Sequence, residues 1–150
     1  MKIVESRIDN RLIHGQVATR WIQHTDAKVI LVVDDDVAGN DFEKNLLKMA
    51  CPKNVQLIVR NCEKAVALVN KDESDFETMI IVKYAKAARR LTELGLKVDH
   101  WTVGNIPGLS SNEERHQILK FFMPTKSEAE DLKYISEGLR CVFLCFVKVE

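Results

Sequence analysis

The stretch Lys28-Val29-Ile30-Leu31-Val32-Val33 holds five consecutive apolar residues, most of them β-branched. A strand with apolar side chains on both faces is typical of a parallel sheet that is covered on both sides. Asp34-Asp35-Asp36 follows directly, and aspartate side chains cap helix N-termini well. The stretch therefore predicts a buried parallel strand that leads into a helix.

The same order of strand and helix recurs along the chain. The other predicted strands cover residues 2–8, 55–59, 78–82, 98–103, 117–123 and 140–149. The predicted helices cover residues 15–23, 37–50, 63–70, 86–94 and 127–138. The strand at 117–123 is expected to run in a different direction, and Ser127-Glu128-Ala129-Glu130 matches a capping box. This alternation predicts an α/β fold: an open, mostly parallel, doubly wound sheet of about seven strands, with helices on both faces.

The composition is that of one soluble globular domain. Hydrophobic residues make up 46% and charged residues 29% of the 150 positions, which excludes a disordered chain. The 22 Lys and Arg balance the 22 Asp and Glu, so no overall positive field favours nucleic acid or an anionic membrane. No apolar run is long enough to span a membrane, and the N-terminus lacks the apolar core of a signal peptide. We therefore expect a single domain over residues 1–150 in the cytoplasm, without a nucleic-acid partner.

The cysteines indicate neither a disulfide framework nor a reactive thiol. Cys51, Cys62, Cys141 and Cys145 form no Cys-x-x-Cys pair, and none has an activating context in the sequence. Cys141 and Cys145 lie in an apolar run, where small buried thiols are common. A reduced, cytoplasmic setting is therefore a better interpretation than secretion.

Polar side chains concentrate in the stretch Arg7-Ile8-Asp9-Asn10-Arg11-Leu12-Ile13-His14-Gly15-Gln16-Val17, between the first predicted strand and the first predicted helix. In a parallel sheet, ligands bind beyond the carboxyl ends of the strands, which is where this stretch lies. His14 at a helix N-terminus is close to free backbone N–H groups and to the positive end of the helix dipole, which suits a phosphate. The same field disfavours the imidazolium, so a neutral nitrogen is available as a nucleophile.

Three neighbours of His14 complete the candidate site. Arg11 offers a planar fork of donors to phosphoryl oxygens, and Asp9 can orient either Arg11 or the imidazole. Gly15 lets the backbone approach a ligand closely. The alternative is that His14 is a turn residue with local hydrogen bonds, and residue type alone does not separate the two.

Other polar groups make weaker candidates. His24, His100 and His116 lack the spacing of metal ligands, and the chain has no glycine-rich nucleotide fingerprint, Walker loop or Gly-x-Ser-x-Gly motif. Asp34-Asp35-Asp36 looks like the acidic pair of a response-regulator receiver domain. That interpretation requires a phosphoacceptor aspartate after a later strand, where this chain has Lys83-Tyr84, and we reject it. Capping of the next helix accounts for the acidic cluster, although one carboxylate can still face the neighbouring strand ends.

The stretch 7–17 closely resembles the active-site loop of the IIB component of the mannose/fructose/sorbose family of the bacterial phosphoenolpyruvate-dependent sugar phosphotransferase system (PTS). Val32-Val33-Asp34-Asp35 and Val103-Gly104-Asn105-Ile106 resemble two further motifs of that family, in the same order along the chain. The resemblance covers at least the first 106 residues. The fold of that family, an open and mostly parallel seven-stranded sheet, agrees with the predicted elements.

The resemblance implies a protein-N(pi)-phosphohistidine–sugar phosphotransferase. In such a protein His14 accepts a phosphoryl group from a phosphorylated IIA partner and passes it to a sugar that enters through the membrane components IIC and IID. The residues expected to be catalytic are His14, Arg11 and Asp9. Those expected to bind phosphate are Arg11, Gly15, Gln16 and Arg7.

The same resemblance sets the remaining expectations. No metal and no cofactor beyond the covalent phosphohistidine is expected. The chain is expected to associate peripherally with the membrane permease, and whether it forms a homo-oligomer is left open. His116-Gln117-Ile118-Leu119 and the loop 107–114 depart from the family pattern, and the sugar is not predicted. A non-catalytic regulatory or phosphate-binding module on the same fold is the alternative. A nucleotide-binding domain is a third possibility, for which the glycine fingerprint is missing.

Overall fold

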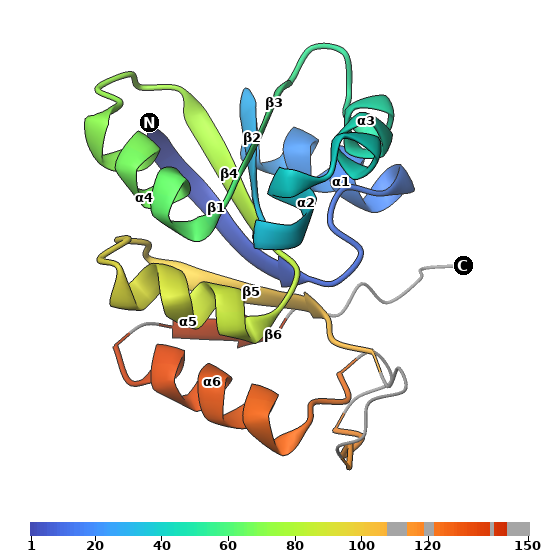
Figure 1. Ribbon diagram of the computed structural model, residues 1–150, viewed down its shortest axis with the longest axis vertical. Helices are drawn as coiled ribbons and strands as arrows, with labels where there is room; N and C mark the ends of the chain where they lie inside the picture. Colours follow the sequence, from blue (N-terminus) through green and yellow to red (C-terminus); the bar gives the residue numbers. More distant parts are fainter. Residues whose placement is uncertain (108–113, 119–121, 139, 144–150) are drawn as a thin grey trace.

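Six parallel strands form one sheet within the residues that the computed structural model describes, which are 1–107, 114–118, 122–138 and 140–143. The strands are β1 (Lys2–Asp9), β2 (Val29–Val33), β3 (Gln56–Arg60), β4 (Glu77–Val82), β5 (His100–Asn105) and β6 (Arg140–Phe143). Their order across the sheet is β3-β2-β4-β1-β5-β6, and every pairing is parallel (Figure 1). The predicted parallel α/β sheet is confirmed, whereas a count of seven strands is not.

Helices cover both faces of this sheet, as predicted. They are α1 (Gly15–Thr25), α2 (Asp35–Gly39), α3 (Asp41–Ala50), α4 (Cys62–Lys71), α5 (Ala85–Glu93) and α6 (Lys126–Ser136). Side chains of α1, α2 and α3 pack in one hydrophobic core, and side chains of α4, α5 and α6 pack in another. The connections after β1 and β2 therefore run over one face, while those after β3, β4 and β5 run over the other.

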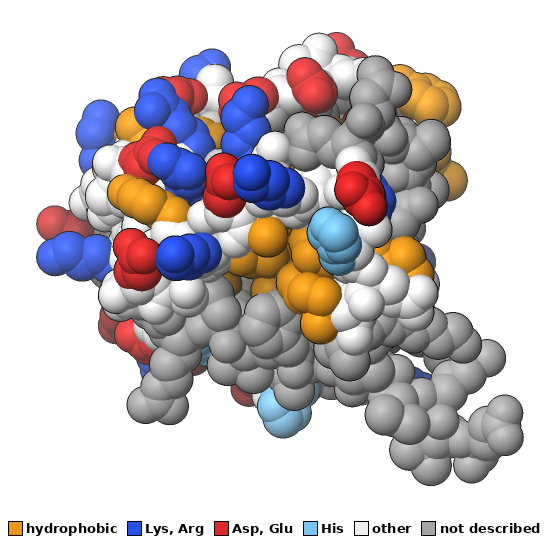
Figure 2. Space-filling model, turned by 90° about the horizontal axis from the view of Figure 1, so that it is seen from below, with side chains coloured by type: hydrophobic (Ala, Val, Ile, Leu, Met, Phe, Trp, Pro, Cys, Tyr) orange, Lys and Arg blue, Asp and Glu red, His pale blue; other side chains and the backbone are white. Residues whose placement is uncertain are grey.

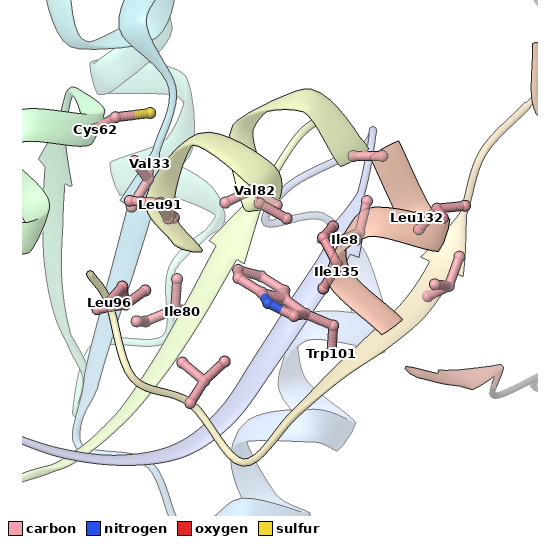
Figure 3. Close-up of a cluster of buried hydrophobic side chains, with 14 of the residues drawn as sticks. Ile8, Val33, Cys62, Ile80, Val82, Leu91, Leu96, Trp101, Leu132 and Ile135 are labelled. Atoms are coloured by element: carbon pink, nitrogen blue, oxygen red, sulfur yellow. The ribbon is translucent and has the colours of Figure 1, made fainter. Parts of the chain in front are cut away.

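The strand β4 shows why the middle of the sheet reads as a continuous apolar run. Ile80 and Val82 belong to the core beneath α4, α5 and α6, and Met79 and Ile81 belong to the core beneath α1, α2 and α3. Successive side chains of a strand point to opposite faces, and here both faces are covered. Trp101 of β5 is fully buried in the core on the α4–α6 side, which also contains Ile135 of α6 (Figure 3).

The predicted helix over 37–50 is wrong, because the segment forms two helices. Asn40 separates α2 from α3 with an extended backbone at φ −115° and ψ 105°. Its side-chain oxygen accepts hydrogen bonds from the N–H groups of Phe42 and Glu43 at 3.0 and 3.2 Å. An asparagine that caps a new helix N-terminus competes with continuation of the previous helix.

The capping box of the last helix starts two residues earlier than predicted. Thr125, and not Ser127, is the N-cap of α6. Its hydroxyl oxygen accepts from the Glu128 N–H at 3.1 Å, and its own N–H donates to Glu128 Oε2 at 2.8 Å. The pair satisfies two N–H groups that a helix start leaves open, so the cap falls where both bonds can form.

The predicted strand at 117–123 is also wrong at the positions that the structure describes, which are 117, 118, 122 and 123. Phe122 forms an isolated parallel bridge with Ile106, and the N–H of Ile118 donates to the Phe122 carbonyl at 3.1 Å. The Met123 N–H donates to the Ile106 carbonyl at 2.8 Å, so the described part of the segment meets the chain just after β5 in a single bridge and forms no strand of the sheet. The last predicted strand, 140–149, is present as β6 up to Phe143; residues 144–149 and 119–121 lie outside the described residues.

The outer surface of α5 and α6 carries paired charges. Arg89 Nη1 lies 3.1 Å from Asp131 Oδ1, and Arg90 Nη2 lies 3.1 Å from Glu63 Oε1. Figure 2 shows basic and acidic side chains interspersed over the described part of this end of the molecule. The Arg90–Glu63 pair is exposed, and an exposed pair stabilises a fold little.

Candidate phosphoryl-transfer site

The loop between β1 and α1 lies at a switch point of the sheet. β1 is flanked by β4 and β5, and the connections of those two strands run over the face opposite to α1. At such a point the neighbouring connections diverge, and the carboxyl edge is left open to a ligand. The predicted position of the site is therefore the one that the topology favours.

Two left-handed residues shape this loop. Leu12 has φ 54° and Gly15 has φ 40°, and the Leu12 N–H donates to the Asp9 carbonyl at 3.0 Å. Leu12 and Ile13 are buried in the core beneath α1. The left-handed backbone of Leu12 is strained, because L-residues with a side chain rarely adopt it. Burial of the Leu12 and Ile13 side chains holds the turn in place. On either side of these two buried residues in the chain, Arg11 and His14 remain accessible.

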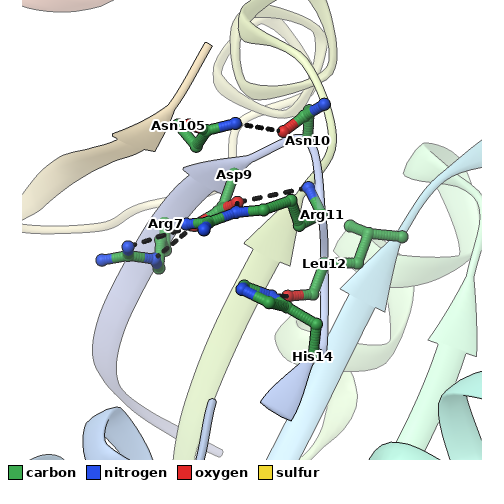
Figure 4. Close-up of polar contacts among 7 residues, drawn as sticks. All are labelled: Arg7, Asp9, Asn10, Arg11, Leu12, His14 and Asn105. Carbon is green, nitrogen blue, oxygen red and sulfur yellow. Dashed lines mark hydrogen bonds and ion pairs between the residues drawn. The ribbon is translucent and has the colours of Figure 1, made fainter. Parts of the chain in front are cut away.

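The Asp9 carboxylate holds two arginines (Figure 4). Arg11 forms a two-point contact, with Nε 2.9 Å from Oδ1 and Nη2 3.0 Å from Oδ2. Arg7 Nη2 lies 3.1 Å from Oδ2 on the other side. Because the Asp9 side chain is only 2% exposed and that of Arg11 is 40% exposed, Asp9 presents Arg11 to the solvent side of the loop.

Arg7 lies beneath this pair. Its side chain is 3% exposed, and its guanidinium stacks 4.7 Å from the ring centre of Trp21 in α1. Burial lowers the pKa of the Arg7 guanidinium from its ordinary value, although the carboxylates of Asp9 and Glu5 act in the opposite direction. Arg7 was predicted to bind phosphate, and the structure places it where it contacts Asp9 instead of the open side of the loop.

Gly104 makes room for the buried pair. A Cβ atom on Gly104 of β5 would lie 2.5 Å from Arg7 Cζ and 2.6 Å from Asp9 Oδ2. The loop is also tied to the end of β5 by Asn105, whose Nδ2 donates to Asn10 Oδ1 at 2.6 Å. The sequence motif around Gly104 pointed to this strand end, but nothing in the sequence paired it with Arg7.

His14 is the N-cap residue of α1, and its side chain makes no capping hydrogen bond. Its Nδ1 lies 3.3 Å from the Leu12 carbonyl oxygen, which can only accept a hydrogen bond. This contact orients the ring at the positive end of the helix dipole. Gly15 and Gln16 contribute the first backbone groups of α1; the Gln16 side chain lies outside the described part.

The other polar residues that the sequence offered as candidates make contacts that stabilise the fold. Asp34 Oδ1 accepts from the Val37 N–H at 2.9 Å, so its predicted capping role is confirmed. Asp35 accepts from the Cys62 N–H at 3.1 Å. His100 Nε2 lies 3.2 Å from Glu5 Oε2, and the His24 ring meets the edge of Trp21. Among the described residues, no three His, Cys, Asp or Glu side chains gather as a metal site would require.

A family model for the PTS system sorbose subfamily IIB component matches residues 3–145. This chain belongs to that family. IIB components are phosphotransferase subunits of the sugar phosphotransferase system. The resemblance of this chain to that family, noted first in the polar loop after β1, is therefore confirmed. No helix in the described ranges has both the length and the apolar character that crossing a membrane requires.

Named relatives agree with this assignment. The mannose-specific EIIAB component of the PTS from Escherichia coli (strain K12) is 32% identical to this IIB component over 137 residues, 91% of this chain and 42% of that protein. The chain thus spans less than half the length of that relative. The fructose-specific EIIB component from Bacillus subtilis (strain 168) is 30% identical over 138 residues, 91% of this chain and 83% of that protein.

A solved structure shows the same architecture. The crystal structure of the PTS N-acetylgalactosamine-specific IIB component 1 from Escherichia coli superposes with a TM-score of 0.89 at 26% identity. The match covers 99% of this chain and 96% of that one. The three relatives carry three different sugar names, so this family membership leaves the sugar open.

Proposed function

We propose that this IIB component accepts a phosphoryl group on His14 from a phosphorylated IIA protein. It then transfers the group to a sugar that enters through membrane components IIC and IID. The observation that carries the proposal is the placement of His14 at the start of α1, in the same loop as an Arg11 guanidinium that Asp9 holds by two contacts. The name of the mannose-specific relative joins an A and a B component, which supports a IIA partner.

The chemistry is an in-line displacement in two steps. In the first step, the bond between phosphorus and the donor histidine of IIA breaks while a bond from phosphorus to a His14 ring nitrogen forms. In the second step, a sugar hydroxyl oxygen takes the place of His14 and its proton leaves to solvent or a base. Charge in such a transition state is spread over the phosphoryl oxygens, so positioning and electrostatics dominate.

The residues of this loop have separate parts in that chemistry. Arg11 donates to phosphoryl oxygens, and Asp9 keeps its guanidinium in place. The N–H groups of Gly15 and Gln16 lie at the positive end of α1 and favour the anion. Arginine and amide donors can neutralise a phosphoryl group, so we propose that the reaction needs no metal or other cofactor, and that it takes place at the cytoplasmic side of the permease.

Labelled phosphate tests the proposal. Wild-type protein incubated with phosphorylated IIA should take up label that is labile in acid and stable in base, as expected of a phosphohistidine. His14→Gln should take up none, and a labelled His14→Gln protein would overturn the assignment. A non-catalytic module on this fold, the alternative function, predicts an unlabelled wild-type protein.

The second step tests Arg11. Removing one donor from a transition-state oxyanion costs about 100-fold in rate, and we expect Arg11→Ala to slow transfer to sugar by about that factor. Arg20→Ala is the matched control, because Arg20 is an exposed arginine of α1. Equal rates for the two variants would remove Arg11 from the mechanism.

A further inference from the structure

Lys83 follows β4 at the same edge of the sheet as the His14 loop. Val82, the last residue of β4, pairs with Val33 of β2 and with Ile8 of β1. In-register parallel strands advance together at a spacing of about 4.8 Å. The residues that come next, Asp34, Lys83 and Asp9, therefore stand in a row, with Lys83 in the middle.

The loop that carries His14 crosses the end of β4. β4 lies between β1 and β2 in the sheet, so the connection from β1 through α1 to β2 has to pass it. Leu12 and Ile13 of the loop share a core with Met79 and Ile81 of β4. Figure 4 shows the His14 ring in front of the β4 ribbon. Lys83 directly follows β4, so the alternation that turns Met79 and Ile81 to this face favours the same face for its side chain.

The carboxylates on either side of Lys83 are already engaged. Asp9 binds Arg7 and Arg11, and Asp34 caps α2. Lys83 is half-buried, and its ammonium forms no ion pair with the residues that the structure describes. Its recorded contact is with the ring of Tyr84, 5.6 Å from Nζ to the ring centre. The ammonium is thus a positive charge at this edge without a fixed negative partner among the residues that the structure describes.

The charges of the loop leave room for such a group. Within the stretch 7–17, the guanidinium groups of Arg7 and Arg11 and the Asp9 carboxylate leave a single positive charge, and the Glu5 carboxylate that acts on Arg7 reduces it further. A phosphoryl group on a side chain carries a charge of about −1.5 to −2 near neutral pH. One more cation within reach would offset more of that charge.

We propose that the Lys83 ammonium binds an oxygen of the phosphoryl group on His14 and shares its charge with Arg11. The proposal rests on the proposed function of His14 and adds a phosphoryl-binding residue to it. Lys83 keeps its proton throughout: the phosphorus bond to the donor nitrogen breaks and the bond to His14 forms, while the ammonium only donates a hydrogen bond. A flexible stem of four methylenes allows it to follow the group as it moves.

The experiment compares Lys83→Met with Lys97→Met. Lys97 is exposed and precedes β5, at the opposite edge of the sheet, so the control removes the same charge about 20 Å away, beyond the screening length of ordinary buffer. The measurements are the initial rate of label uptake from phosphorylated IIA, the ³¹P chemical shift of the phosphohistidine, and the midpoint of thermal unfolding. Lys83→Met should lower the rate about tenfold, the size of a lost charged hydrogen bond.

Further arms separate binding from structure. Lys83→Met should move the ³¹P resonance and leave the unfolding midpoint near that of wild type, Lys83→Arg should restore most of the rate, and Lys97→Met should change nothing. A wild-type rate and ³¹P position in Lys83→Met would overturn the role of Lys83 alone. A slow Lys83→Met with an unmoved resonance and no rescue by arginine would indicate a structural role and overturn it too. An unlabelled wild-type protein would overturn this inference together with the proposed function.

Discussion

Gly104→Ala should destabilise the protein although its backbone accepts alanine. The glycine lies within β5, and its φ is not in the left-handed region, so the backbone itself asks for no special residue. The obstacle is space: the new methyl carbon would lie 2.5 Å from Arg7 Cζ and 2.6 Å from Asp9 Oδ2. Ordinary contacts between carbon and such atoms are about 3.5–4.0 Å, so the pair has to move.

The cost follows from the burial of that pair. Arg7 and Asp9 side chains are 3% and 2% exposed, and Trp21 covers the guanidinium, so neither group can swing into water without leaving its partner. Breaking a buried ion pair costs about 3–5 kcal/mol because a charge is left uncompensated. Because β5 can relax in part, we expect a loss of unfolding free energy at the lower end of this range, about 3 kcal/mol. That loss corresponds to a fall of about 10 °C in the midpoint of thermal unfolding.

Urea unfolding at neutral pH measures this free energy. Gly39→Ala is the control, because a Cβ on Gly39 meets no atom within 4 Å and its φ is also unexceptional. In an Arg7→Ala background, Gly104→Ala should cost less, since two of its three close contacts are with the guanidinium that is gone and only the contact with Asp9 Oδ2 is left. A loss of less than about 1 kcal/mol in the wild-type background, or equal losses in both backgrounds, would refute the reasoning.

Two further predictions concern the scaffold. Asn40→Ala should lower the free energy of unfolding by about 1 kcal/mol, because α3 loses its N-cap, whereas Asn45→Ala, exposed within the same helix, should be nearly neutral in urea unfolding. Burial and the Asp35 carboxylate raise the pKa of the Cys62 thiol to about 11, against 9.0 for an ordinary thiol. Its thiolate fraction at pH 8 should be about 100-fold below that of a free cysteine and should rise with pH, so peptide mapping after iodoacetamide treatment should find Cys62 unmodified at pH 8; rapid modification would contradict its burial.

Local sequence patterns predicted which helices and strands are present better than they predicted where each one begins and ends. The strand at β2 and the cap at Asp34 depend on neighbouring residues alone, and both predictions are confirmed. The prediction of a single helix over 37–50 is wrong because the apolar period does not show that the Asn40 side chain caps a new helix. The strand at 117–123 failed because an apolar run does not say whether the sheet has an open position beside it.

For the candidate site, too, the sequence predicted some features and not others. The residues of the stretch 7–17 and their position after a strand were enough to propose an anion site at His14, because the carboxyl ends of parallel strands share one edge. The sequence could not say that Arg7 points under Trp21 while Arg11 points outward, since both are arginines flanking the same aspartate.

The sequence by itself determined that strands and helices alternate and that a polar loop, the candidate phosphate site, follows the first strand, because both depend on residues close together in the chain. Only the tertiary structure decided the strand order that places β4 between β1 and β2. The same order places β5 beside β1, which brings Gly104 against the Arg7–Asp9 pair, and it puts the end of β4, before Lys83, between the ends of β1 and β2. These contacts join residues up to about a hundred positions apart, and the packing of whole layers selects them, not local preference.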